Sequence, residues 1–282
     1  MSDDAPTTRQ RRLAAELRKL REAAGHTQAQ AVKLLGWKDR TKLVRIESGK
    51  QAPGLDEVGR ILEHYGPTDE AMRLALVQLA RDVHKRGWWV AYGDIIDGSY
   101  VELEDAASRI CTWQVQLVPG LLQTPAYARE LVAAEVDDAD EIDRRVQARM
   151  TRRTLLDRAD APELNVVLAE EVLRRPVGGR PVMRQQLAAL LREVERPNVS
   201  VRVVPLERGI YPAIGQGSLV LFQFAGPLDL DVAYLESIGG GMYLESIAQV
   251  RQCTVMFDRI ADAALPVDES AALIADILKE MR

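Results

Sequence analysis

Three glycines divide the first fifty residues into segments that are long enough only for small helices. Gly25, Gly36 and Gly49 each follow a run whose apolar residues recur at spacings of three and four, the period of one helix face. Glycine often ends such helices because it adopts left-handed backbone angles without strain. Short helices are marginal alone, so this part of the chain must pack several of them around one core.

The apolar spacing predicts five helices before residue 90, with Thr27 as the N-cap of the second. The third helix is expected over residues 40–48 and the fifth over 69–86. The side chains expected to face the common core are Leu13, Leu17, Leu20, Ala24, Ala31, Leu34, Leu35, Leu43, Ile46, Leu55, Val58, Leu62, Tyr65, Met72, Leu76, Leu79 and Val83.

The third helix has two different sides when its residues are placed at 100° intervals. Leu43 and Ile46 fall on the inner side. The other side is cationic and hydroxyl-bearing over an arc of about 140°, and it carries Arg40, Thr41, Val44, Arg45 and Ser48.

The charge distribution separates this segment from the rest of the chain. The whole protein has a net charge of -5, yet residues 1–66 hold 13 Lys and Arg against 9 Asp and Glu. Residues 67–282 hold 24 against 33. A basic segment in an acidic chain favours contact of this segment with a polyanion.

Two short helices joined through "LGWKDR", the second apolar inside and polar outside, have the organisation of a helix-turn-helix. In that motif the second helix enters the major groove and its N-terminal residues reach base edges. The stretches "LRKLREAAGHTQAQAVKLLGW" and "TKLVRIESGKQAP" resemble the Xre-type, lambda-repressor-like helix-turn-helix domains. The segment Gly36–Glu47 is one residue longer than usual in them, and the extra residue falls in "WKDR".

The resemblance implies a role for each of several residues. Base edges would be contacted by Arg40, Thr41 and Arg45, and phosphates by Gln28, Lys42 and Lys50. Val44 either meets a thymine methyl group or is simply an exposed aliphatic side chain. Glu47 is expected to pair with Arg21 of the first helix and so to support the motif rather than to touch DNA.

The second half of the chain is predicted to be a larger α+β domain. Strands are expected over 163–169, 198–206, 218–224 and 230–237 and in "MYLES", with a crossover helix between the first two. Helices are expected over 101–114, after Thr124, and over 139–158, 246–263 and 268–281. The predicted organisation is therefore a helix-turn-helix domain over 1–66, a connecting helix over 67–88 and a regulatory, partner-binding α+β domain over 89–282.

The second half also resembles the C-terminal domain of actinobacterial regulators similar to WhiJ, through "YVELEDAASRICTWQVQLVPGLLQTPAYARELV", "VRVVPLERGIYP" and "FDRIADAALPVDESAALI". That resemblance implies a transcriptional regulator with an antitoxin-like pairing to a very small partner protein. The partner would bind the C-terminal domain. Leu121, Leu122 and Tyr127 are candidates for lining that surface, but a Leu-Leu pair beside a capped helix is more often part of a core.

No motif in the chain indicates an enzyme, a metal or another cofactor. The acidic pair Glu170-Glu171 has no nucleophile elbow, metal-ligand pair or phosphate loop beside it. The two cysteines lie far apart, and no apolar run is long enough for a bilayer, so we expect a cytoplasmic protein with reduced thiols.

The function expected from the sequence is sequence-specific regulation of transcription by a homodimer on double-stranded DNA, with an effector or small partner on the second domain. Two alternatives remain open. One is an antitoxin-like interaction module that sequesters its partner and binds DNA only for autoregulation. The other is a sensor of a small molecule.

Overall fold

The computed structural model describes residues 8–67, 69–84, 88–92, 95, 98–226, 230–237 and 240–281. The chain separates into two compact units, and the main boundary falls between Leu103 and Glu104. The first unit is helical, and the second contains the sheet. Among the described residues no helix is sufficiently long and apolar to cross a membrane.

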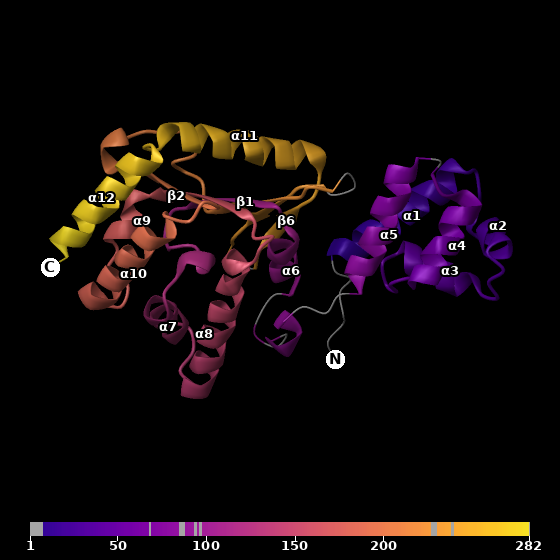
Figure 1. The fold of residues 1–282 in the computed structure, drawn as a ribbon, viewed down its shortest axis with the longest axis horizontal. Helices are drawn as coiled ribbons and strands as arrows, with labels where there is room; N and C mark the ends of the chain where they lie inside the picture. Colours follow the sequence, from indigo (N-terminus) through magenta and orange to yellow (C-terminus); the bar gives the residue numbers. More distant parts are fainter. Residues whose placement is uncertain are drawn as a thin grey trace. The chain divides into compact units, whose positions relative to one another are not determined.

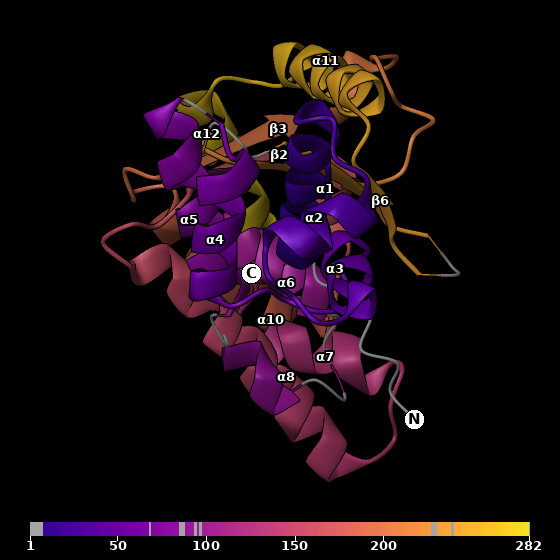
Figure 2. The same ribbon diagram turned by 90° about the vertical axis from the view of Figure 1, so that its right-hand side faces the viewer.

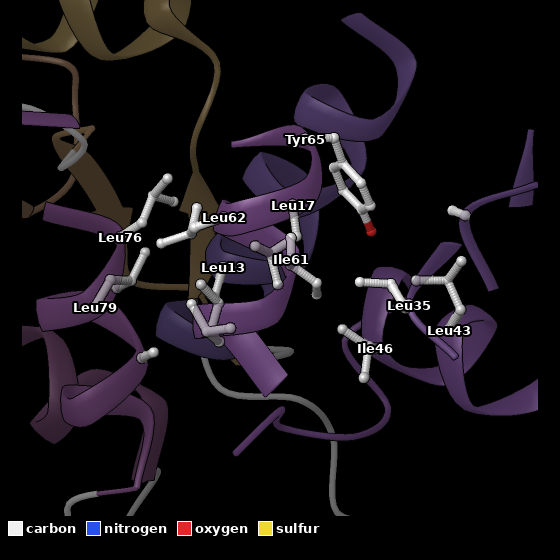
Figure 3. Packing of buried hydrophobic residues seen from close by; sticks show 13 residues of the cluster. Leu13, Leu17, Leu35, Leu43, Ile46, Ile61, Leu62, Tyr65, Leu76 and Leu79 are labelled. Atoms are coloured by element: carbon white, nitrogen blue, oxygen red, sulfur yellow. The ribbon is translucent and has the colours of Figure 1, made fainter. Parts of the chain in front are cut away.

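The first unit is the five-helix domain predicted from the sequence. Its helices are α1 (Thr8–Ala23), α2 (Gln28–Leu34), α3 (Arg40–Glu47), α4 (Leu55–Tyr65) and α5 (Glu70–Val83). One cluster of buried side chains joins them, including Leu13 and Leu17 from α1, Leu43 from α3 and Ile61 from α4. Figure 3 shows that Leu76 and Leu79 of α5 belong to the same cluster. The helix expected as a connector therefore completes the core of this unit.

The helix boundaries follow from the residues that mark them. Gly25, Gly36 and Gly49 have φ values of 74°, 66° and 73°, the left-handed region that favours glycine after a helix. Thr27 begins α2 with a capping box, in which its side chain accepts from the backbone N–H of Gln30 and the Gln30 side chain accepts from the N–H of Thr27. These signals confirm the predicted starts and ends of the short helices.

Three core predictions in this unit were wrong. Leu34 and Leu55 are 40% and 46% exposed, and Ala24 lies beyond the end of α1 and is exposed. Leu34 and Leu55 occupy the last and first positions of their helices, where a side chain extends past the neighbouring helices instead of between them. Ile61, which the pattern did not include, is fully buried.

The second unit is built on a six-stranded sheet with the order β3-β2-β1-β4-β5-β6. The first three of these strands run parallel to one another, and the remaining neighbours pair antiparallel. The strands are β1 (Arg109–Gln114), β2 (Glu163–Ala169), β3 (Val199–Val204), β4 (Leu219–Gln223), β5 (Val232–Leu235) and β6 (Met242–Leu244).

Helices cover both faces of this sheet, which makes the unit a mixed α/β domain as predicted. Helix α11 lies along one face and contacts β1, β3, β4 and β5, whereas α7 and α8 lie on the other side (Figures 1 and 2). Helix α10 connects the parallel strands β2 and β3, which is the predicted crossover. Helix α6 (Gly98–Ala106) spans the boundary between the units, and the helices wholly within the second unit are α7 (Pro125–Ala133), α8 (Ala139–Arg153), α9 (Glu170–Arg174), α10 (Gly179–Glu193), α11 (Ile247–Ala263) and α12 (Val267–Glu280).

The predicted helix over 101–114 was wrong in its second half. Helix α6 ends at Ala106, and the chain then enters β1, whose register places Ile110 beside Leu164 of β2 and Phe222 of β4. A strand buried on both faces reads as a continuous apolar run without alternation. The segment "RICTWQ", with polar residues at both ends and Thr112 inside, shows neither that run nor a regular alternation, so pairing with two distant strands decides its structure.

Of the two alternatives for Leu121, Leu122 and Tyr127, a partner surface or part of a core, the structure shows the core. All three side chains are buried, Leu122 and Tyr127 completely. The Tyr127 hydroxyl accepts from the Val118 N–H at 3.2 Å, and the Leu122 carbonyl accepts from the Gln186 side chain at 2.7 Å. Burial raises the pKa of Tyr127. These residues pack the loop after β1 between α7, α8 and α10, so they form core and not surface.

Candidate nucleic-acid interface

Helix α3 presents the predicted polar face to solvent. Arg40, Thr41, Val44 and Arg45 are exposed, whereas Leu43 and Ile46 on the opposite side are buried in the domain core. Asp39 caps the helix by accepting from the Thr41 N–H at 2.8 Å, and that hydrogen bond lowers the pKa of the Asp39 carboxyl group. The cap fixes the first turn of α3, the turn from which Arg40 and Thr41 project.

A buried ion pair joins α1 to the end of α3. Arg21 donates from Nε to Oε1 of Glu47 at 2.6 Å and from Nη2 to Oε2 at 3.0 Å. Both side chains are more than nine-tenths buried, and Arg21 also donates to the His26 carbonyl at 2.7 Å. The hydrogen bond with Glu47 raises the pKa of Arg21. A bidentate pair of this kind holds two helices in one relative orientation.

Gln28 extends the buried pair to the exposed face of α3. Its Nε2 donates to Glu47 Oε2 at 3.0 Å, and its Oε1 accepts from Nη2 and Nε of Arg40 at 3.0 and 3.3 Å. The side chain assigned to a phosphate by the sequence thus holds Arg40 in place in the free protein. Arg21, Glu47, Gln28 and Arg40 form one hydrogen-bonded chain from the core to the surface, called the Arg21–Arg40 relay below.

The two lysines that were predicted to contact DNA phosphates have different surroundings. Lys42 forms an ion pair with Glu57 of α4 and lies 4.9 Å from the centre of the Trp37 ring. Burial alone would raise the pKa of Glu57, but hydrogen bonds from Lys42 and from the Gly54 N–H keep it below its usual value. Lys50 is exposed, and its side chain forms no hydrogen bond or ion pair with the residues that the structure describes. The protein therefore already supplies Lys42 with a counter-charge.

Sequence reasoning missed Trp37 and Glu57 as parts of this interface. Trp37 is half-buried against the domain core, and Glu57 also accepts from the Gly54 N–H at 2.9 Å as part of the α4 cap. The capping signal of Glu57 was visible, because an acid at the third position of a helix commonly turns back to its start. The contact between Glu57 and Lys42 was not visible in the sequence, because the two residues lie on separate helices.

Two family models match the chain, one to each unit. A helix-turn-helix domain model matches residues 12–76, and a model described as a domain of unknown function, DUF5753, matches residues 98–276. The second match covers more than half of the protein. The chain belongs to the DUF5753 family. No match was found among curated proteins or among solved structures.

The helix-turn-helix match extends from α1 into α5 and so includes the whole relay and the exposed face of α3. This kind of domain indicates DNA binding by the N-terminal part of the DUF5753 protein. The DUF5753 domain itself begins at α6 and extends through most of α12. Within the described residues, no three His, Cys, Asp or Glu side chains are grouped so that they would hold a metal ion.

Proposed function

We propose that this DUF5753 protein is a sequence-specific transcriptional regulator of the Xre, lambda-repressor-like kind, similar to WhiJ-like regulators and located in the cytoplasm with its DNA. The proposal rests on one observation above all. The exposed face of α3 carries Arg40, Thr41 and Arg45, and the relay fixes Arg40 before any ligand binds. An arginine held in position loses less conformational entropy when it binds a base edge or a phosphate.

The proposal includes a homodimer on a roughly palindromic site. One recognition helix as short as α3 contacts only a few base pairs, and single modules of this size bind specific DNA weakly. Two copies whose recognition helices are spaced by about one DNA turn read two half-sites. A site selected from random DNA is therefore expected to contain an inverted repeat.

Arg45→Ala is expected to weaken binding to such a selected site by about 1 to 3 kcal/mol, because Arg45 projects from the exposed face where an arginine donates to two acceptors on guanine. Binding to scrambled DNA of the same length should change much less. Fluorescence anisotropy titrations of both DNAs measure the difference. Arg81→Ala, which removes an exposed arginine from α5, is the matched control and should leave both affinities unchanged. Equal losses on the two DNAs would remove Arg45 from base recognition.

Lys50→Ala is expected to reduce the slope of log affinity against log salt by about one, because an exposed lysine that neutralises a phosphate releases a condensed counterion. Lys42→Ala should change that slope less, since Lys42 is already paired with Glu57. Titrations of scrambled DNA at several salt concentrations give both slopes. A larger change for Lys42→Ala than for Lys50→Ala would contradict this assignment.

The proposal gives the chain no catalytic role. Of the acidic residues considered in the sequence, Glu170 is engaged in structural contacts. It accepts from Arg174 Nε at 2.6 Å and from the Leu206 N–H at 2.7 Å. A carboxylate held in this way supports the loop after β3 rather than proton transfer.

A partner protein or effector on the DUF5753 domain remains part of the proposal, but its surface must differ from the one expected from the sequence. Leu121, Leu122 and Tyr127 are buried. The segment after β3 instead exposes apolar side chains, with Ile210 89% exposed and Ile214 half exposed. Such a concentration of exposed apolar side chains is more favourable to partner contact than the buried loop.

A further inference from the structure

Arg149 in the DUF5753 domain is a half-buried cation without a carboxylate partner. It lies on α8, and its Nη1 donates to Gln123 Oε1 at 3.0 Å. Across the described part of the chain, no carboxylate oxygen lies within the 4.0 Å that defines an ion pair with this guanidinium. Charged groups withdrawn from water in proteins are normally paired, so the missing anion requires an explanation.

The neighbouring arginines on the same helix face do have carboxylate partners. Arg145 precedes Arg149 by one turn and donates to Glu141 at 2.6 Å. Arg152 follows it by three residues and donates from Nη2 to Glu104 at 2.7 Å, and Glu104 is almost completely buried. Both neighbouring charges are therefore balanced within the domain. Among the described residues, Arg149 is the one of these three arginines that has no carboxylate within ion-pair distance.

The surroundings of Arg149 fix its position but do not neutralise it. Gln123 is buried, and its Nε2 donates to the Val118 carbonyl at 2.7 Å, which leaves its Oε1 to accept from Arg149. Burial, and then the charge of Arg152, lower the pKa of Arg149, whereas the charges of Glu135 and Glu236 act in the opposite direction. The side chain is thus held partly out of water by a neutral amide.

We propose that Arg149, positioned by Gln123, binds an oxyanion, the carboxylate or phosphate group of a small ligand of the DUF5753 domain. A guanidinium has five N–H donors in a planar fork that matches these groups with two parallel hydrogen bonds. Gln123 accepts from Nη1, and within the described residues the guanidinium forms no other hydrogen bond that would compete with a bound anion. The side chain is also only partly buried, which leaves access for a ligand from solvent. The site goes beyond DNA binding and lies in the other unit of the chain.

The test compares anions at equal ionic strength on the full-length protein. Sodium phosphate, sodium acetate and sodium chloride are titrated separately, and hydrogen exchange is followed in peptides of α8 and of residues 115–124. Phosphate, acetate or both should increase protection in a saturable way, and chloride should not. A stronger effect of phosphate identifies a phosphorylated ligand, and a stronger effect of acetate identifies a carboxylate ligand. No protection beyond that in chloride overturns the proposal.

Arg149→Met removes the charge while keeping a long side chain, and it should weaken the binding of the effective anion about tenfold or more. In chloride the variant loses an unbalanced charge but also leaves the buried Gln123 Oε1 without its donor, so its protection in chloride serves as its own baseline for the anion titrations. Arg251→Met, which removes an exposed arginine of α11, is the matched control and should keep the wild-type response. An undiminished response of Arg149→Met would overturn the assignment. The DNA binding of Arg149→Met is measured separately. A negative result for anion binding therefore does not contradict the proposed regulatory function.

Discussion

Glu47→Ala is expected to lower the free energy of unfolding of the N-terminal domain by about 3 to 5 kcal/mol, the usual cost of removing one partner of a buried ion pair. The substitution leaves Arg21 buried without its bidentate acceptor and leaves Gln28 without the oxygen that orients it. Arg21 keeps the His26 carbonyl, which is neutral, and the Glu22 carboxylate at 3.3 Å, which is half exposed and screened by water. Hydrogen exchange of peptides from α1 and α3 measures the loss for this domain separately from the second one.

Glu22→Ala is the matched control for this prediction. Glu22 also lies within ion-pair distance of Arg21, at 3.3 Å, but its side chain is half exposed. Exposed ion pairs contribute about 0 to 1 kcal/mol, so this variant should remain close to the wild type. If both glutamate variants lose the same small amount of protection, the Arg21–Glu47 pair does not hold the helices together. Replacing both Arg21 and Glu47 by apolar residues should recover much of the loss.

Tyr127→Ala is expected to destabilise the DUF5753 domain by about 3 to 5 kcal/mol, because deleting a fully buried aromatic side chain leaves a cavity. Tyr127→Phe fills the same space but removes the acceptor of the Val118 N–H, which should cost about 1 to 3 kcal/mol. Thermal unfolding and hydrogen exchange of peptides from α7 give the order wild type, Tyr127→Phe, Tyr127→Ala.

A surface residue serves as the comparison for Tyr127. Ile210→Ala shortens an apolar side chain that is almost fully exposed, and such changes usually lie within about 0.5 kcal/mol of the wild type. Native stability in Tyr127→Ala would mean that the side chain does not belong to the core. Loss of a partner by this variant says nothing about direct contact unless its folding is shown to be intact.

The N-terminal domain was largely predictable because its signals are local. Helix ends at Gly25, Gly36 and Gly49 and the cap at Thr27 depend on backbone geometry within a few residues. The contact between Arg21 and Glu47 was predictable as well, since both residues fall on inward faces of amphipathic helices. The exposure of Leu34 was not predictable from the sequence. Helical periodicity gives the face on which a side chain lies, but not where the neighbouring helices end.

The second domain was predictable in its element types but not in its central strand. Residues 163–169 and 199–204 follow turn signals and are rich in β-branched side chains, and both form strands. Strand β1 begins shortly after α6 ends, and its mixture of polar and apolar residues shows no regular alternation, so the local pattern does not mark the boundary. Its identity depends on β2 and β4, and sequence periodicity does not encode that pairing.

In the candidate DNA interface, too, the sequence pattern did not predict which side chains pair across separate helices. The sequence placed Lys42 among the cations of α3 and assigned it to a phosphate. Its partner Glu57 belongs to the next helix, and Trp37 lies beneath it in the turn. A helical wheel gives the direction of a side chain but not what occupies the space it reaches. Arg149 is the converse case, since its hydrogen-bond partner is the neutral Gln123 while its neighbours on α8 are paired with carboxylates.

The pairing of β1 with β4 has a consequence for the order in which this protein is completed during synthesis. Arg109 of β1 lies opposite Gln223 of β4, and the Ser108 N–H donates to the Gln223 carbonyl at 2.9 Å. The edge of β1 that faces β4 thus lacks its neighbour until most of the domain has emerged from the ribosome. The helical DNA-binding domain is assembled from nearby contacts long before then. During that interval the nascent chain carries a folded helical domain and an edge of β1 without its neighbouring strand, and such an unpaired edge can pair with another chain.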